Sequence, residues 1–360
     1  MPPIGRDPER FRAAAQLIEQ GVAQRAFPAA VIEVGEGTRP VWRQAFGRLH
    51  AGETAPQAHD DTVFDLASLT KVLATSAVAM QQVERGAIGL DDPVAYHLPR
   101  WRAADRASVT IRDLLAHCGG LTGHLPLFRT VEGQEAFEQA MCAGPLEYQP
   151  RTRSVYSDLG FMLLGFMFGG STPLAARFDT LRTQMGFVED LQFSPPQHWM
   201  SRIAPTEFDT WRGRLLVGEV HDENAAALGG VAGHAGLFGT AAGVGQYARH
   251  LLQVLSGRAG AFRRETVEAF VARRTDVPGS SRALGWDTML PTSSCGRRMS
   301  PRAFGHTGFT GTSVWIDPDR EIYVVLLTNR VCPSRESTAI KLVRPAVHDA
   351  VMTALEERSP

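Results

Sequence analysis

Strand patterns occur near both ends of this 360-residue chain, whereas the residues between them are mostly helical or irregular in pattern. Residues 29–36 (AAVIEVGE) and 41–49 (VWRQAFGRL) predict two strands around the turn GTRP. Three more strands are predicted at 283–290, 303–317 and 321–329, with the tight turn PDR between the last two. We therefore expect the two ends of the chain to form one sheet.

Helix patterns surround and separate these strands. They predict an amphipathic helix at 8–22, a long helix at about 68–85 that ends at Gly86, a short helix capped by Thr110, and a closing helix at 336–357. The region from about 122 to 235 is expected to be helix and loop, with many Gly and Pro residues.

This order of elements predicts a mixed α+β fold in which an antiparallel sheet is flanked by terminal helices. We expect a single catalytic domain over 1–360. Its α/β lobe would comprise about 1–66 and 236–360, and its helical lobe about 67–235. A cleft between the two lobes is the expected place for an active site.

The composition narrows the possible partners. Apolar residues make up 44% of the chain and charged residues 21%, as in ordinary soluble proteins, and the formal net charge is −1. Nucleic acid and anionic lipid are therefore not expected partners. The longest nearly uncharged apolar run, 159–170, is too short to span a bilayer, which takes about 20 residues. The first residues lack the apolar core of a signal peptide, which predicts a cytoplasmic protein, or a periplasmic one if a leader was removed.

Neither a metal nor a cofactor is predicted. The four cysteines contain no C-x-x-C pair and are interpreted as small buried hydrophobic residues. The nearest approach to a zinc motif, His221-Asp222-Glu223, lacks a second His one helical turn later.

Lysine is rare in this chain, and its placement is informative. Only two of the 37 basic residues are Lys, and one of them, Lys71, follows Ser68 by three positions in an apolar stretch. At this spacing both side chains lie on one face of a helix. A Ser hydroxyl needs a base to act as a nucleophile, and Arg cannot serve because it does not lose its proton. Lys can serve if burial lowers its pKa. The alternative is a helix-capping Ser followed by a surface Lys.

Two further segments offer partners for this pair. In VYSDLGFMLLG, Tyr156 can relay a proton once a nearby Lys stabilises its anion, although Ser157 and Asp158 also fit a helix cap with Tyr156 as a hydrophobic staple. In FGHTGFTGTSVW, three glycines at 305, 308 and 311 suggest close approach by a ligand or another backbone. The amides of Phe309 and Ser68 would then form an oxyanion hole. The alternative there is a bulged strand edge with a surface His306.

The order Ser-x-x-Lys, Tyr-Ser-x and His-Thr-Gly resembles the serine β-lactamase and penicillin-binding-protein superfamily. The most similar branch holds class C β-lactamases, D-alanyl-D-alanine carboxypeptidases and related esterases. The segments IGLDDPVAYHLP, VTIRDLLAHCGGL and GTSVWIDPDREIYVVLLTNR add to this resemblance, which covers about 10–355. It implies a β-lactamase-like fold and a serine hydrolase without a cofactor, which would act on a small-molecule amide, ester or β-lactam. The oligomeric state is not predicted.

The resemblance also implies roles for individual residues. Ser68 would be the acylated nucleophile, Lys71 would take and return its proton, and Tyr156 would assist as a base and protonate the leaving group. The strand residues His306, Thr307 and Gly308 would lie beside the substrate, and the Phe309 and Ser68 amides would bind the oxyanion.

Two departures from the family pattern concern the substrate. The third motif begins with His306 where β-lactamases often have Lys, and the second has Asp158 where many relatives have Asn. An ionised Asp cannot donate a hydrogen bond to a substrate carbonyl, and His holds a carboxylate only when protonated. Both changes argue against efficient β-lactam hydrolysis.

The segment 220–241 resembles a region of cell-wall peptidases and amidases. This resemblance suggests that His234 reaches the cleft, and that Asp222 or Glu223 holds a substrate amine. Helix capping and surface charge explain these two acids equally well.

A catalytically idle binder of peptides or cell-wall fragments is the alternative function, but it has no need of Ser68, Lys71 and Tyr156 together. An α/β-hydrolase is not favoured, because the chain has no G-x-S-x-G elbow.

Overall fold

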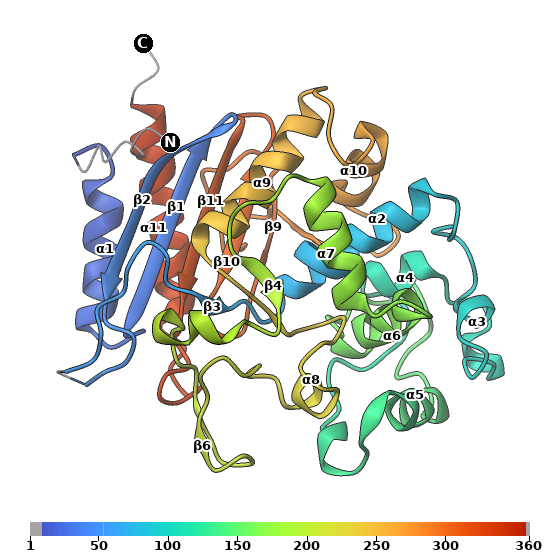
Figure 1. Ribbon diagram of the computed structural model, residues 1–360. Helices are drawn as coiled ribbons and strands as arrows, with labels where there is room; N and C mark the ends of the chain where they lie inside the picture. Colours follow the sequence, from blue (N-terminus) through green and yellow to red (C-terminus); the bar gives the residue numbers. More distant parts are fainter. Residues whose placement is uncertain (1–8, 53, 358–360) are drawn as a thin grey trace.

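A computed structural model describes residues 9–52 and 54–357 (Figure 1). Its main sheet is antiparallel throughout and has the strand order β2-β1-β11-β10-β9-β8. The strands are β1 (Ala29–Glu36), β2 (Arg39–Gly47), β8 (Asp287–Thr288), β9 (Phe304–Thr307), β10 (Ser313–Asp317) and β11 (Ile322–Thr328). The pairing of β1 with β11 joins the two ends of the chain, as predicted.

Helices cover both faces of this sheet (Figure 1). Alternation along β1 explains the two layers, because successive side chains of a strand point to opposite faces. Ile32 and Val34 pack in one core with helices α1 (Arg12–Ala23) and α11 (Ile340–Glu356). Val31 packs in the other core with α9 (Ala241–Leu255).

The second core continues into the helices that follow β2. They are α2 (Ser76–Glu84), α3 (Val94–His97), α4 (Ile111–Leu115), α5 (Gly133–Ala143), α6 (Asp158–Gly169), α7 (Leu174–Gln184), α8 (Glu223–Ala227) and α10 (Arg264–Val271). Shorter turns are η1 (Lys71–Thr75), which is π-helical, and the 3₁₀ turns η2 (Ala104–Arg106), η3 (Leu127–Arg129) and η4 (Gln197–Arg202). Helix α6 is buried on all sides, as its uniformly apolar sequence requires.

Two small sheets lie outside the main sheet. One has the order β3 (Phe64–Asp65), β7 (Leu237–Gly239), β4 (Leu191–Phe193), and the other pairs β5 (Phe208–Asp209) with β6 (Arg214–Leu215). Within the described residues no single helix is long and apolar enough to cross a membrane, and α6 and α7 meet that test only together, across a 78° bend.

The predicted α+β class is confirmed, with several differences in detail. The predicted strand 41–49 is found at Arg39–Gly47, and the closing helix begins at Ile340 instead of residue 336. Residues 303–317 form the two strands β9 and β10 instead of one, because the chain turns at 308–312. Only 287–288 of the predicted strand 283–290 are in the sheet, and the middle region contains the short strands β4 to β6. Residue 8 of the first predicted helix lies outside the described residues. The division into two lobes stays a prediction.

Candidate active site

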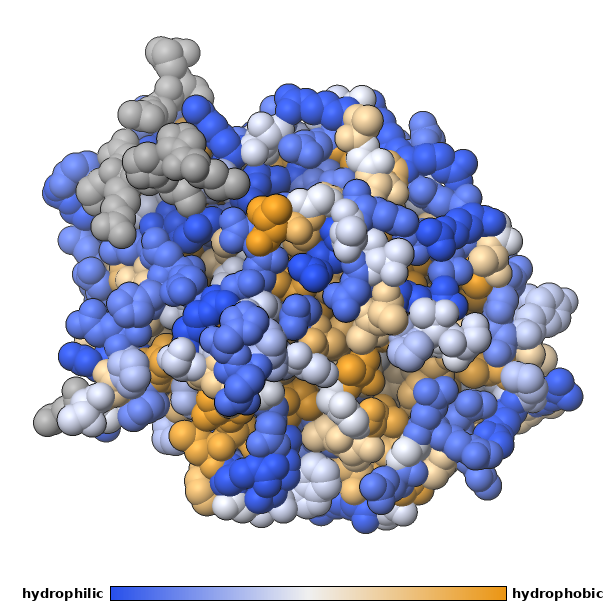
Figure 2. Space-filling model, in the orientation of Figure 1, coloured by the Kyte–Doolittle hydropathy of each residue, from blue (hydrophilic) through white to orange (hydrophobic). Residues whose placement is uncertain are grey.

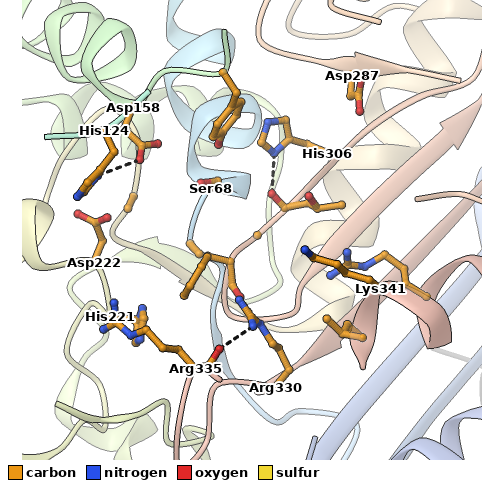
Figure 3. A pocket seen from close by; sticks show the side chains of 18 of the residues that line it. Ser68, His124, Asp158, His221, Asp222, Asp287, His306, Arg330, Arg335 and Lys341 are labelled. Carbon is orange, nitrogen blue, oxygen red and sulfur yellow. Dashed lines mark hydrogen bonds and ion pairs between the residues drawn. The ribbon is translucent and has the colours of Figure 1, made fainter. Parts of the chain in front are cut away.

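A cavity of about 750 Å³ lies where the end of β9 meets the turn before η1 (Figure 3). Loops before α6 and around α8 form one side, and the start of α11 forms another. Most of the predicted site residues line it, namely Ser68, Tyr156, Asp158, His306, Thr307, Gly308 and Phe309. The sequence motifs, which are spread over about 240 residues of chain, therefore meet at one place.

The turn that presents Ser68 is held in an unusual conformation. Ala67 has a φ of 46°, which is the left-handed region that residues with a Cβ rarely adopt. The Asp65 carboxylate accepts hydrogen bonds from the Ala67 amide at 2.8 Å and from the His221 amide at 2.6 Å. The helix begins with 3₁₀-type bonds at residues 66–71 and continues as the π-helical turn η1, a feature that often marks functional sites. The predicted helix at 68–85 is thus present with an irregular start.

Ser68 and Lys71 are in direct contact, as their spacing predicted. The Lys71 Nζ lies 3.0 Å from the Ser68 Oγ. Lys71 is completely buried, and its ammonium also contacts the His234 carbonyl oxygen at 3.1 Å and the Asp158 carboxylate at 2.8 Å. The alternative of a surface Lys beside a capping Ser is therefore excluded.

The charge state of Lys71 differs from the expectation that burial leaves it neutral. Burial does act to lower its pKa, but the Asp158 carboxylate and the Tyr156 oxygen outweigh that effect, and the pKa is raised. Burial acts to raise the pKa of Asp158, but the charge of Lys71 outweighs this effect, and the pKa of Asp158 is lowered. The resting site therefore holds an ammonium–carboxylate pair that the apolar neighbours in the sequence did not reveal.

Tyr156 completes the cluster. Its ring centre lies 5.0 Å from the Lys71 Nζ, and its hydroxyl interacts with both Lys71 and Ser68. Burial raises the pKa of this phenol more than Lys71 lowers it, so the neutral form is favoured. The Tyr156 ring packs against the His117 ring, with 4.7 Å between the ring centres. The His117 Nδ1 accepts a hydrogen bond from the Ser157 amide at 3.0 Å. Ser157 also caps α6 and Asp158 lies in its first turn, as the capping interpretation predicted for these two residues.

The third motif lies opposite on β9. His306 is only 3% exposed, and its Nδ1 lies 2.9 Å from the Thr307 carbonyl oxygen. Burial, followed by the charge of Arg282, keeps the pKa of His306 well below its ordinary value. His306 is therefore a neutral side chain at the cavity wall, which is unsuited to pairing with a substrate carboxylate near neutral pH.

Gly308 is required by a close approach between two backbones. A Cβ at this position would lie 2.6 Å from the Leu66 carbonyl oxygen. Thr310 and Thr312 donate hydrogen bonds to the Asp65 and Leu66 carbonyl oxygens, at 2.8 and 3.1 Å, and hold this turn against the Ser68 turn. Within the described chain, the Ser68 and Phe309 amides donate no hydrogen bond, and both residues face the cavity.

The structure corrects the predicted position of the His234 side chain. The side chain was expected to reach the cleft, but it is 1% exposed, and its Nε2 lies 2.8 Å from the Asp222 carboxylate. Only its backbone takes part, through the carbonyl that accepts from Lys71. Asp222 caps α8, and both Asp222 and Glu223 line the cavity.

Several cavity residues were not predicted from the sequence. They include His124, Arg282, Asp287, Arg330, Arg335, Lys341 and Arg344. Arginines are too common in this chain to stand out. Lys341, however, is the second of the two lysines, so the rarity argument that identified Lys71 would also have identified it. Among the described residues, no cluster of His, Cys, Asp and Glu side chains is arranged to hold a metal ion.

Comparison with known proteins identifies the family of this chain. A family model described as beta-lactamase matches residues 14–347. The N-acetylmuramyl-L-alanine amidase of Bacillus subtilis (strain 168) is 30% identical over an alignment of 366 positions, which spans 89% of this chain and 81% of that protein. An Escherichia coli (strain K12) protein named "Putative D-alanyl-D-alanine carboxypeptidase" is 31% identical over 372 aligned positions, which span 89% of this chain and 82% of that protein.

The fold is likewise shared with solved structures. The class C beta-lactamase of Rhodobacter sphaeroides superposes with a TM-score of 0.76 at 19% identity, over 96% of this chain and 99% of that one. The resemblance noted from the sequence motifs is confirmed by both kinds of comparison. This chain belongs to the beta-lactamase family and is a hydrolase of that family.

Proposed function

We propose that this enzyme cleaves an amide bond through an acyl-enzyme on Ser68. The observation that carries the proposal is the 3.0 Å contact between the Ser68 Oγ and the buried Lys71 Nζ, with the Tyr156 hydroxyl interacting with both. A hydroxyl at the cavity wall, with a buried amine and a phenol beside it, supplies the groups that nucleophilic catalysis needs.

The first step prepares the base. Lys71 is charged at rest, so it must release a proton before it can accept the one on Ser68. That proton leaves toward solvent past His124, which is half-exposed and whose Nδ1 lies 3.7 Å from the Asp158 carboxylate. The Asp158 carboxylate raises the pKa of His124, while burial opposes this, so His124 is able to exchange the proton with solvent.

Acylation follows from the same geometry. Ser68 gives its proton to neutral Lys71 as its Oγ bonds to the substrate carbonyl carbon, and the Ser68 and Phe309 amides stabilise the negative oxygen. Tyr156 passes a proton from Lys71 to the leaving nitrogen as the C–N bond breaks. Water then hydrolyses the ester, which releases the acid and restores Ser68.

The substrate is proposed to be a cell-wall peptide or muropeptide. Two relatives, at 30% and 31% identity, are named for amide-cleaving activities on such molecules. Efficient β-lactam hydrolysis is not expected, because Asp158 presents an ionised carboxylate and His306 is neutral. Short-chain esters share the nucleophile and are the second class to test.

Labelling with a fluorophosphonate tests the nucleophile independently of the substrate. We expect the wild-type enzyme to be labelled once, and Ser68→Ala to remain unlabelled. If wild-type protein is not labelled and Ser68→Ala changes no measured property, the chain is an idle binder of peptides or cell-wall fragments.

A parallel rate comparison then identifies the substrate class. The panel is an N-acetylmuramyl-L-alanine peptide, a D-alanyl-D-alanine peptide, p-nitrophenyl butyrate and nitrocefin. We expect one of the two peptides to give the highest kcat/KM, and Ser68→Ala to abolish it. A higher value for the butyrate would replace the proposed amidase by an esterase, with the same nucleophile.

A further inference from the structure

Two aromatic side chains lie next to the cavity wall that the start of α8 forms. The Phe128 and Trp211 rings meet edge to face, with 4.9 Å between their centres and 61° between their planes. Trp211 is 48% exposed, and Leu125, three residues before Phe128, is 37% exposed. Figure 2 shows hydrophobic side chains over the lower part of the molecule, where Figure 1 places β6 and α8. Large apolar side chains that are exposed together mark a binding surface. We call Phe128 and Trp211 the aromatic platform.

The backbone around Trp211 is held in one conformation. The buried Asp209 carboxylate accepts hydrogen bonds from the Trp211 amide at 2.6 Å and from the Arg212 amide at 3.0 Å. The Arg212 guanidinium bonds to the same carboxylate and also donates to the His221 carbonyl oxygen at 2.9 Å. The tip of the β5–β6 hairpin is therefore tied to the segment that leads into α8.

Phe128 is fixed to α8 as well. Asn224 is completely buried, and its Oδ1 accepts a hydrogen bond from the Phe128 amide at 2.9 Å, while its Nδ2 donates to the Leu125 carbonyl oxygen at 2.9 Å. His124, directly before this loop, lines the cavity, as do the two residues directly before Asn224. A ligand on the platform costs little conformational entropy, because the backbone is already fixed and an aromatic side chain has few rotamers.

The polar surroundings of the platform select the class of ligand. The Arg129 guanidinium lies 5.5 Å from the Phe128 ring centre, is exposed, and forms no ion pair with a described residue. A purely apolar partner would leave this donor without a hydrogen bond. A sugar has C–H groups on its faces, which contact the electron-rich face of an aromatic ring, and oxygens at its edge, which accept hydrogen bonds from a guanidinium.

We propose that the aromatic platform binds a sugar ring of a muropeptide whose peptide part occupies the cavity. The two sites are contiguous, because His124 and the start of α8 line the cavity and are continuous with the backbone that carries the platform. This inference rests on the proposed function. It narrows the substrate to a peptide that still carries its sugar, as opposed to a free stem peptide.

Calorimetric titration of the full chain with Ser68→Ala, which prevents turnover, tests the proposal. The probes are N-acetylmuramyl-L-alanyl-D-isoglutamine and the sugar-free dipeptide L-alanyl-D-isoglutamine. We expect the sugar-bearing probe to bind about tenfold more tightly, and Trp211→Ala to remove this advantage without changing the affinity for the dipeptide. The control Tyr96→Ala, which removes a 76% exposed aromatic side chain on α3, should change neither affinity.

Equal affinities for the two probes, or undiminished binding of the sugar-bearing probe by Trp211→Ala, would overturn the inference. A wild-type dimer in sedimentation that Trp211→Ala converts to a monomer would also overturn it, because the platform would then join two copies of the chain. Trp211→Leu keeps an apolar side chain at the hairpin tip and replaces Trp211→Ala if that variant does not fold.

The same experiment separates this inference from the proposed function. Binding is measured without catalysis, whereas fluorophosphonate labelling of the chain with Ser68 intact reports the nucleophile alone. A labelled enzyme that binds both probes equally refutes only the aromatic platform. An unlabelled enzyme that binds the sugar-bearing probe through Trp211 refutes only the nucleophile.

Discussion

The pair between Lys71 and Asp158 gives the sharpest test of the active-site chemistry. Asp158→Asn keeps the size of the side chain and an oxygen that accepts a hydrogen bond, but it removes the negative charge that lies 2.8 Å from the Lys71 Nζ. Because that charge favours the ammonium form, its loss lowers the pKa of Lys71. The amine is then neutral, and able to act as a base, at lower pH.

The expected size of the effect follows from the geometry. Two unit charges 2.8 Å apart attract by about 6 kcal/mol at an effective dielectric constant of about 20. A tenfold change in an equilibrium requires about 1.4 kcal/mol. Solvent reaches the partly exposed carboxylate and weakens the attraction, yet even a quarter of it shifts the fraction of neutral Lys71 about tenfold.

The rate of fluorophosphonate labelling reports this shift directly, because it measures a single step at Ser68. We compare the rates of the two proteins at the same pH, along the acidic limb of the profile. Wild-type enzyme should label more slowly as the pH falls. In Asp158→Asn the rate at pH 6 should exceed the wild-type rate at least tenfold, because the acidic limb of the profile moves to lower pH.

A matched control uses Asp222→Asn, which changes another carboxylate of the same cavity that is bonded to His234 and not to Lys71. Its profile should stay at the wild-type position. If Asp158→Asn also keeps the wild-type profile, or moves the acidic limb to higher pH, the charged resting state of Lys71 is wrong.

Three further substitutions test separate parts of the structure. Tyr156→Phe should slow peptide hydrolysis by about 10²–10⁴-fold at unchanged melting temperature, because it removes a proton relay and no packing. Gly308→Ala places a Cβ 2.6 Å from the Leu66 carbonyl oxygen and should slow labelling about 10²-fold as the Phe309 amide moves, whereas an unchanged rate would rule out this oxyanion site. Burial lowers the pKa of His348 to about 3, so stability should fall as pH drops below about 6.5, where only the unfolded state gains a proton. His348→Leu should remove about 2 kcal/mol of the loss between pH 7 and pH 5 in urea unfolding, and an equal loss in both proteins would contradict this.

The sequence predicted the parts of the site that lie close together in the chain. The spacing of Ser68 and Lys71 determines their contact through helix geometry alone, and β1 appears with the predicted bounds as a mostly apolar run that ends at a turn. Tyr156 and the His306 motif were placed by resemblance, since no local pattern brings them to Ser68.

Other features depended on contacts that the sequence does not display. The apolar neighbours of Lys71 predicted a neutral amine, but its charge is set by Asp158, 87 positions later. The turn at 308–312 that divides 303–317 into two strands is fixed by bonds to Asp65 and Leu66. His234 was expected in the cleft, yet the chain direction at that point presents its backbone instead.

The joining of β1 to β11 also has a consequence for biosynthesis. Val34 pairs with Val324, so a ribosome working at about 5–20 residues per second emits the second partner roughly 15–60 s after the first. Until then the β1–β2 hairpin displays an apolar, unpaired edge that can associate with other nascent chains. Productive folding of this enzyme is therefore delayed until translation is nearly complete, and its yield should depend on whatever shields that edge in the meantime.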